Sequence, residues 1–120
     1  MERVLVVVPT YNERENVRPL VEELLAQGET IDVWVADDGS PDGTALAVRE
    51  VMAAHPGRVD LLLRSEKAGR GAAVLAAFKR GLADPRGYSV FLEMDADFSH
   101  HPREIPKFLA KLESCDMVVG

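Results

Sequence analysis

Hydrophobic residues along this chain form two alternating kinds of pattern. Short apolar runs occur at residues 4–8, 31–36, 59–63, 88–93 and 116–119. Runs of this length are typical of strands that are buried on both faces of a parallel sheet. Longer amphipathic stretches separate them, and this alternation predicts an α/β fold in which helices cover both faces of a mostly parallel sheet.

Four helices are predicted from apolar residues that recur every three or four positions. Their buried faces are, in chain order, Val17, Leu20, Val21, Leu24 and Leu25; Ala45, Val48 and Met52; Leu75, Phe78 and Leu82; and Ile105, Phe108, Leu109 and Leu112. Gly28 is expected to end the first helix and Asp42 to cap the second. The third is expected to begin just after Gly71, and the fourth at Pro102.

The sequence contains no linker, repeat or low-complexity segment, which predicts one domain over residues 1–120. The last predicted strand stops at Gly120, where a βα junction would follow. We therefore expect a truncated domain, the alternative being an edge strand at a genuine C-terminus.

Composition narrows the function classes. With 14 basic and 20 acidic residues the formal charge is -6, and no basic stripe with interleaved aromatics is present, so no nucleic-acid partner is expected. The chain has no signal peptide and no apolar run of the roughly 18 residues that a membrane span needs, which predicts a cytoplasmic protein. Any membrane association would be peripheral. Trp34 and Cys115 are interpreted as core residues.

Polar residues gather directly after three of the predicted strands. The segments are PTYNE at 9–13, DDGSPDGT at 37–44 and DAD at 95–97. In an open parallel sheet, ligands bind outside the carboxyl ends of the strands. These three junctions are therefore the candidate site.

Asp95 and Asp97 are the candidate metal ligands. On an extended segment their side chains project to the same side, about 6 to 7 Å apart along the backbone. Mg²⁺ and Mn²⁺ prefer such oxygen ligands and retain room for phosphate oxygens. An isolated Asp-x-Asp is more simply two solvated residues. Asp37 and Asp38, expected to end a neighbouring strand at the same edge, favour the metal interpretation because four clustered carboxylates repel one another without a cation.

The first two junctions offer groups for a nucleoside. Tyr11 can supply a stacking face and Glu13 a carboxylate, while Asn12 is expected to be the N-cap of the first helix. Asp37 and Asp38 point to opposite faces of their strand, so one is expected to reach the ligand and the other to cap the turn. Residues 40–43 are interpreted first as a turn, and only second as ligand contacts.

Basic residues before the third helix are candidates for phosphate contact. Lys67 and Arg70, with the neighbouring glycines Gly69 and Gly71, would place positive charge and backbone amides there. They do not form a dinucleotide fingerprint, because Val74 occupies the third glycine position. His100 and His101, after the acidic segment, are interpreted as structural rather than as metal ligands.

These junctions together resemble family 2 glycosyltransferases, and most closely the dolichyl-phosphate or polyprenyl-phosphate mannose synthases. The matching segments are PTYNEREN (9–16), DDGSPDGT (37–44), Lys67 with Gly69 and Gly71, and MDADFSHHP (94–102). The similarity covers nearly the whole chain. The second and last of these segments are the most specific for the mannose synthases.

The resemblance implies a Rossmann-like GT-A fold that binds GDP-mannose with Mg²⁺ or Mn²⁺ and transfers mannose with inversion to an isoprenoid phosphate at the membrane surface. Matching positions of the nucleoside pocket are Pro9, Tyr11, Glu13, Ala36 and Asp38. The diphosphate-metal segment corresponds to Asp95, Ala96 and Asp97, whose two carboxylates are the expected catalytic groups. Acceptor-side residues are expected beyond Gly120, so no turnover is expected of the 120-residue chain itself.

Four alternatives are weighed from the sequence. A sibling enzyme would transfer glucose from UDP-glucose to the same kind of acceptor. A receiver domain is disfavoured because PTYNE, rather than an acidic pair, follows the first strand, and a nucleotidyltransferase because no glycine-rich loop does. A nucleotide-binding module without catalysis is the fourth.

Overall fold

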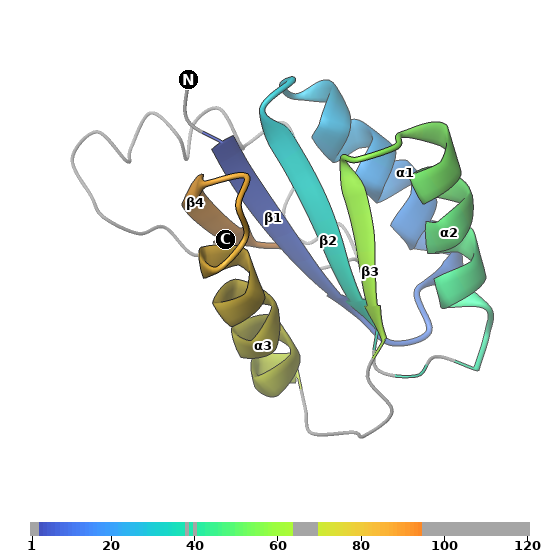
Figure 1. The fold of residues 1–120 in the computed structure, drawn as a ribbon. Coiled ribbons are helices and arrows are strands. Elements are labelled where there is room, and N and C mark those ends of the chain that lie inside the picture. Colours follow the sequence, from blue (N-terminus) through green and yellow to red (C-terminus); the bar gives the residue numbers. More distant parts are fainter. Residues whose placement is uncertain (1–2, 38, 40, 64–69, 95–120) are drawn as a thin grey trace.

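The computed structural model describes residues 3–37, 39, 41–63 and 70–94. Its elements are β1 (Arg3–Thr10), α1 (Arg14–Ala26), β2 (Ile31–Asp37), α2 (Thr44–Ala54), β3 (Val59–Leu63), α3 (Arg70–Leu82) and β4 (Tyr88–Glu93) (Figure 1). The first four predicted strands and first three predicted helices are confirmed, although the third helix begins at Arg70 and not after Gly71. The predicted strand at 116–119 and the helix from Pro102 lie outside the described residues.

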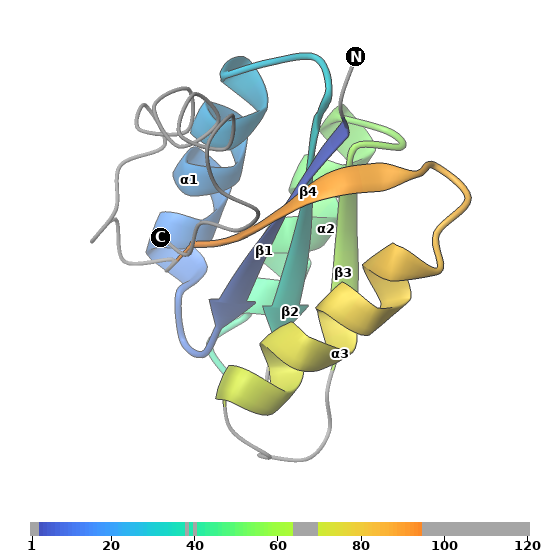
Figure 2. The same cartoon turned by 90° about the vertical axis from the view of Figure 1, so that its left-hand side faces the viewer.

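The four described strands form one parallel sheet in the order β3-β2-β1-β4. Helices α1 and α2 cover one face and α3 covers the other, as Figure 2 shows. After β3 the chain crosses back over the sheet to place β4 beside β1. The strand order therefore reverses between β1 and β4, which is where open α/β sheets bind ligands. The expectation that the second and fourth strands are neighbours is wrong, since β1 lies between them.

The core has two layers because side chains of successive strand residues point to opposite faces. Towards α1 and α2 lie, among others, Val4, Val6, Val8, Val33 and Val35. Towards α3 lie Leu5, Val7, Trp34 and Ala36. Every residue of β2 is buried, whereas the edge strand β3 is only partly covered, with Leu63 54% exposed. Burial on both faces was thus predicted correctly for the central strands and wrongly for this edge.

Helix α1 buries the five residues that its spacing predicted, Val17, Leu20, Val21, Leu24 and Leu25. It ends at Ala26 with Gln27 as C-cap, just before Gly28. In α2 the buried residues are Thr44, Val48 and Val51, while Ala45 and Met52 are only half-buried. The face of α2 is therefore rotated slightly from the predicted one.

Helix α3 turns to the sheet a face that only partly matches the predicted one: Phe78 packs against the core as expected, but Leu75 and Leu82 do not. Leu75 is 54% and Leu82 73% exposed, whereas Val74 and Ala77 are buried. Gly81 allows the close approach: a Cβ there would lie 2.7 Å from Leu5 Cδ2 and 2.8 Å from Phe91 Cε1. Small residues thus form the contact, and a pattern based on large apolar residues misses it.

A buried carboxylate, Asp32, organises the amino ends of the strands. Its side chain is fully buried, accepts a hydrogen bond from the Tyr88 hydroxyl at 2.6 Å and pairs with Arg3 at 2.8 Å. Arg86 lies 3.5 Å and Arg58 4.0 Å from its oxygens. Burial, reinforced by the bond to Asp32, raises the pKa of Tyr88 well above its ordinary value. This network lies at the opposite end of the sheet from the candidate site.

Within the described ranges, no helix combines the length and the apolar character that crossing a membrane requires.

Candidate functional site

The carboxyl ends of β1 and β2 are joined by a buried hydrogen bond. Thr10 and Asp37 are register partners, and the Thr10 hydroxyl donates to Asp37 Oδ1 at 2.7 Å. Asp37 is fully buried and Thr10 is 4% exposed. This bond places the Asp37 carboxylate inside the sheet edge, where it fixes the two strand ends relative to each other. Of the two aspartates considered for ligand contact, Asp38 lies outside the described residues.

After β1 the chain makes a tight turn into α1. Asn12 has a φ of 56°, a left-handed conformation that asparagine tolerates better than most residues. Glu13, not Asn12, is the N-cap of α1, so the predicted cap is wrong. Tyr11 is 43% exposed, which leaves part of its ring accessible at this edge. Pro9 in β1 is half-buried.

Ala36, the other small residue predicted to line the pocket, is 1% exposed. It packs with Val7 and Trp34 in the layer that faces α3. Its position is one residue before Asp37, at the carboxyl end of β2. Ala36 therefore lies at the predicted edge of the sheet, on the α3 face.

The cap of α1 comes from the loop before α2. The Glu13 side chain makes no capping bond. Instead, the backbone N–H of Glu13 donates to the Thr44 hydroxyl oxygen at 3.1 Å, and the N–H of Arg14 donates to Asp42 Oδ2 at 3.2 Å. Such N–H groups at a helix start have no partner within the helix. Residues of the second junction thus supply the hydrogen-bond acceptors for the backbone N–H groups at the start of α1.

The N-cap of α2 is Gly43 rather than the predicted Asp42, but the Asp42 side chain does bond the first residue of this helix. Asp42 Oδ1 accepts the backbone N–H of Thr44 at 3.0 Å and also the Thr44 hydroxyl. Gly43 has a φ of 92°, a conformation that favours glycine. The hydrogen bond from the Thr44 hydroxyl lowers the pKa of Asp42 below its usual 3.8, so the capping group is an anion at neutral pH.

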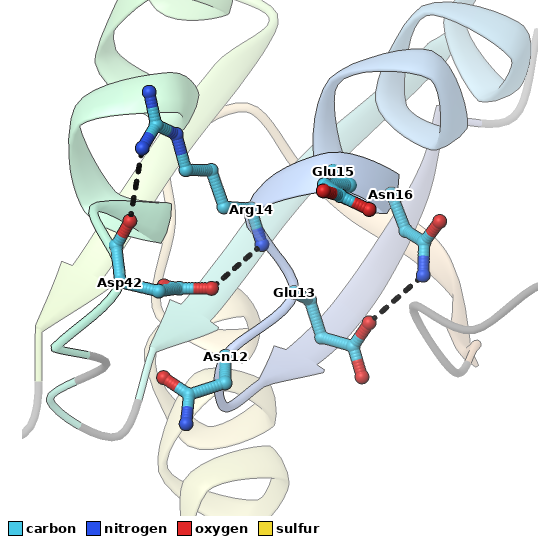
Figure 3. A pocket seen from close by; sticks show the side chains of 6 residues that line it. All are labelled: Asn12, Glu13, Arg14, Glu15, Asn16 and Asp42. Carbon is cyan, nitrogen blue, oxygen red and sulfur yellow. Dashed lines mark hydrogen bonds between the residues drawn. The ribbon is translucent and has the colours of Figure 1, made fainter.

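A hollow of about 320 Å³ opens at this junction (Figure 3). Its lining residues are Asn12, Glu13, Arg14, Glu15, Asn16 and Asp42. Glu13 Oε2 accepts a hydrogen bond from Asn16 Nδ2 at 3.1 Å, and the Arg14 guanidinium donates to the Asp42 carbonyl oxygen at 3.5 Å. Three carboxylates and one cation make this hollow better suited to hydrogen-bond donors of a ligand than to phosphate oxygens.

The acidic segment follows β4 directly in the sequence. The N–H of Met94 donates to the Val7 carbonyl oxygen at 3.0 Å, and the Met94 side chain is 1% exposed. The chain is therefore held against β1 up to the residue that precedes Asp95. Since β1 and β4 are adjacent, this point lies at the reversal of strand order, where the fold favours a ligand.

Several predicted site residues lie outside the described part of the chain: Asp38, Lys67, Asp95, Ala96 and Asp97. Arg70 is the first residue of α3, and only its backbone is described. Among the residues that the structure does describe, no three His, Cys, Asp or Glu side chains are grouped so that they could hold a metal ion.

Sequence reasoning included Thr10 and Thr44 in the candidate junctions and Arg14 in a matching segment, but it gave none of the three a role. The spacing of Asp42 and Thr44, in which a carboxylate accepts the N–H two residues later, is a recognisable turn pattern. It could have identified their mutual bond. The bonds to Glu13 and Arg14 join residues about 30 positions apart and have no local signature.

A family model described as glycosyl transferase family 2 matches residues 5–120. The chain is 46% identical over 120 residues to polyprenol monophosphomannose synthase of Mycolicibacterium smegmatis, covering 99% of this chain and 44% of the relative. It is 42% identical over 118 residues to undecaprenyl-phosphate mannosyltransferase of Micrococcus luteus, covering 98% and 47%. The chain thus spans less than half the length of these curated relatives.

Solved structures share the fold. The mannosyltransferase PcManGT from Pyrobaculum calidifontis, in complex with GDP-Man and Mn²⁺, superposes with a TM-score of 0.79 at 26% identity, covering 94% of this chain and 33% of that one. Glucosyl-3-phosphoglycerate synthase from Mycobacterium tuberculosis superposes with a TM-score of 0.69 at 18% identity, covering 94% and 40%. The second likeness concerns the fold alone.

The strand order also separates this chain from the receiver alternative. Receiver domains have the order 2-1-3-4-5, whereas the order here is β3-β2-β1-β4. With the solved relatives, this arrangement identifies the predicted GT-A fold. The family match extends over nearly the entire chain and includes all three strand-end junctions. The chain belongs to glycosyl transferase family 2.

Proposed function

We propose that the protein transfers mannose from GDP-mannose to a dolichyl or polyprenyl phosphate, with inversion and with the help of Mg²⁺ or Mn²⁺. The observation that carries this proposal is the 46% identity, along 99% of the chain, to a polyprenol monophosphomannose synthase. The solved relative that holds GDP-Man and Mn²⁺ supports the same donor. A cytoplasmic protein that is peripheral to the membrane would meet such a lipid acceptor at the bilayer surface.

The described junctions support binding of the nucleoside. Tyr11 offers a partly exposed side chain and Glu13 a carboxylate that can accept hydrogen bonds from a base. Pro9 and Ala36 are assigned to the wall of the pocket. Asp37 acts through its bond to Thr10, and Asp38, the next residue, is assigned to the nucleoside itself.

Phosphate contact is assigned to the start of α3. Arg70 begins this helix, and Lys67 precedes it by three residues in the sequence. The positive end of a helix dipole and two cationic side chains favour a diphosphate. These basic residues complement the acidic hollow at α1, which favours the other end of the nucleotide.

Asp95 and Asp97, with Ala96 between them, are assigned to the metal. The donor set fits, because carboxylate and phosphate oxygens are the ligands that Mg²⁺ and Mn²⁺ prefer. The buried Met94, bonded to β1, anchors the start of this segment at the ligand-binding edge of the sheet. A divalent cation bound there supplies positive charge that stabilises the departing nucleoside diphosphate. The acceptor phosphate is already anionic and needs little activation by a base.

Metal-linked nucleotide binding provides the first test. Calorimetric titration of the full-length protein with GDP should give binding in MnCl₂ and at least tenfold weaker binding in EDTA. Asp95→Ala and Asp97→Ala should each abolish the effect of manganese. Asp84→Ala, which removes a turn aspartate at the far end of the sheet, should leave it intact. Binding of GDP that is indifferent to manganese would contradict the metal assignment.

Donor specificity requires a transfer assay. Full-length protein should move labelled mannose from GDP-mannose to a polyprenyl phosphate in vesicles, and should leave UDP-glucose largely unused. Equal transfer from UDP-glucose would move the assignment to a glucosyltransferase of the same family. Absence of transfer to the lipid, with GDP binding intact, would overturn the acceptor.

A further inference from the structure

The cap that joins the first two strand-end junctions uses both carboxylate oxygens of Asp42. One oxygen accepts the Arg14 N–H at 3.2 Å, and the other accepts the Thr44 N–H at 3.0 Å. The helices α1 and α2, which lie side by side, therefore share one capping group (Figure 1). A single carboxylate at two helix starts is stabilised by both helix dipoles.

Thr44 links the same two junctions through its hydroxyl group. The hydroxyl donates to Asp42 Oδ1 and accepts the backbone N–H of Glu13 at 3.1 Å. The Thr44 residue is fully buried, so its hydroxyl group is shielded from water although Asp42 and Glu13 are partly exposed. Breaking either link leaves a polar group at the start of α1 without this partner.

The segment held in this way is the one assigned to the nucleoside. Tyr11 and Glu13 flank Asn12, whose φ of 56° is uncommon outside glycine and persists only where neighbouring bonds fix it. Directly after Asn12 in the chain, the backbone N–H groups of Glu13 and Arg14 are bonded to Thr44 and Asp42. A loop that is ordered before the ligand arrives binds more tightly, because less conformational entropy is lost on binding.

We propose that Asp42 and Thr44 are positioning residues, which hold the loop of Tyr11, Asn12 and Glu13 in the conformation that binds the donor nucleoside. This inference rests on the proposed function for its ligand. Asp42 also lines the hollow beside this loop, as one of its three carboxylates. The positioning effect of Asp42 and Thr44 passes through the backbone of residues 13 and 14.

A matched pair of aspartate variants tests the proposal. Asp84 also accepts the backbone N–H two residues later, from Arg86 at 2.9 Å, but it lies in the turn between α3 and β4 at the opposite end of the sheet. In the full-length protein with MnCl₂, Asp42→Ala should raise the Kd for GDP about fivefold to tenfold, the range expected for loss of a helix cap. Asp84→Ala should change it less than about twofold.

Substitutions of Thr44 separate the hydroxyl from its packing. Thr44→Val keeps the shape of this buried side chain and removes the hydroxyl, so the Kd for GDP should rise about fivefold. Thr44→Ser restores the hydroxyl and should bring the Kd back towards the wild-type value. A general loss of core packing would predict the reverse order, because serine leaves a cavity and valine does not.

Amide hydrogen exchange in the free protein gives a second readout that needs no ligand. Residues 10–16 should exchange faster in Asp42→Ala and Thr44→Val than in the wild type, and should be unchanged in Asp84→Ala. The proposal is overturned if Asp42→Ala and Asp84→Ala have equal effects on the GDP Kd, or if exchange at 10–16 does not respond. Failure of the wild-type protein to bind GDP would instead overturn the proposed function, and exchange alone would then decide whether this cap orders the loop.

Discussion

At the scale of single residues, two aspartates at opposite ends of the sheet show how environment sets the role of a carboxylate. Asp32 is fully buried between Arg3 and Tyr88, whereas Asp42 lies near the surface and accepts N–H groups at two helix starts. The first is a structural centre that the candidate site does not use. The second connects the junctions from which the site is built.

Removal of the Asp32 carboxylate should destabilise the protein strongly. Asp32→Ala leaves the Tyr88 hydroxyl without its acceptor and removes the buried carboxylate that pairs with Arg3, so a loss of about 3–5 kcal/mol in the free energy of unfolding is expected. Asp60→Ala is the control, because it breaks a surface pair with Arg80 worth under about 1 kcal/mol. Urea denaturation of the full-length protein measures both. Equal losses for the two variants would show that the buried network around Asp32 stabilises the protein no more than a surface ion pair does.

The lowered pKa of Asp42 predicts an acid-dependent contribution to stability. Because its folded pKa lies below the unfolded value of 3.8, this contribution is fully present above 3.8 and is lost as the pH falls through the folded pKa. Asp42→Asn should therefore melt at a lower temperature than the wild type at pH 7. The difference should shrink as the pH is lowered from about 4 to 3. Melting curves that stay equally far apart at every pH would contradict the assignment.

At the scale of whole elements, α3 shows why a pattern of large apolar residues does not always identify a buried face. The helix approaches the sheet through Val74, Ala77 and Gly81, while Leu75 and Leu82 remain exposed. The size of the residues at the contact sets the distance between helix and sheet. That distance is a property of the packed layers and is not encoded in the periodicity of α3 alone.

Gly81→Ala should destabilise the fold although alanine is the better helix former. The added methyl group would lie 2.7 Å from Leu5, a fully buried residue with little freedom to move. Overpacking of this kind costs about 1–3 kcal/mol, against a gain of up to about 1 kcal/mol in helix propensity. Leu82→Ala, at the exposed neighbouring position, should change stability by less than about 0.5 kcal/mol. Thermal unfolding compares the two, and a stabilising Gly81→Ala would show that α3 is free to move outwards.

At the scale of the whole molecule, the reversal of strand order between β1 and β4 decides where the site lies. The ends of β1 and β2 are locked by Thr10 and Asp37, and Met94 holds the end of β4 against β1. The four strands within the described residues are parallel, so their carboxyl ends share one edge. The carboxyl ends of the strands thus form an acidic and polar edge that is open to a ligand. The amino ends hold the buried network around Asp32.

A ligand that binds at this edge should stabilise the full-length protein in a metal-dependent way. At a concentration about 100 times its Kd, GDP with MnCl₂ should add about 2.7 kcal/mol to the free energy of unfolding, which appears as a rise in melting temperature. EDTA should remove most of this rise. UDP serves as the control nucleotide and should stabilise less. An equal rise for GDP with and without the metal would argue against a shared metal and diphosphate site.

The sequence by itself determined the order of elements, because hydrophobic periodicity is local. It located the four described strands within one or two residues, the buried face of α1 and the three polar junctions, and the resemblance that those junctions carry led to the family. Its errors fell on features that depend on distant neighbours. These were the exposed side of α3, the separation of β2 from β4 by β1, and the N-cap of α1.

Only the tertiary structure decided how the junctions are connected. Local preference favoured Asn12 as the cap of α1, but the caps come from Asp42 and Thr44, about 30 residues away. The buried bond of Asp37 to Thr10 likewise depends on the register of two strands. Hydrogen bonds between separate segments form only after the sheet has brought the segments together. For this reason a sequence pattern can predict which residues lie at a site. Only the tertiary structure determines which of these residues position the others.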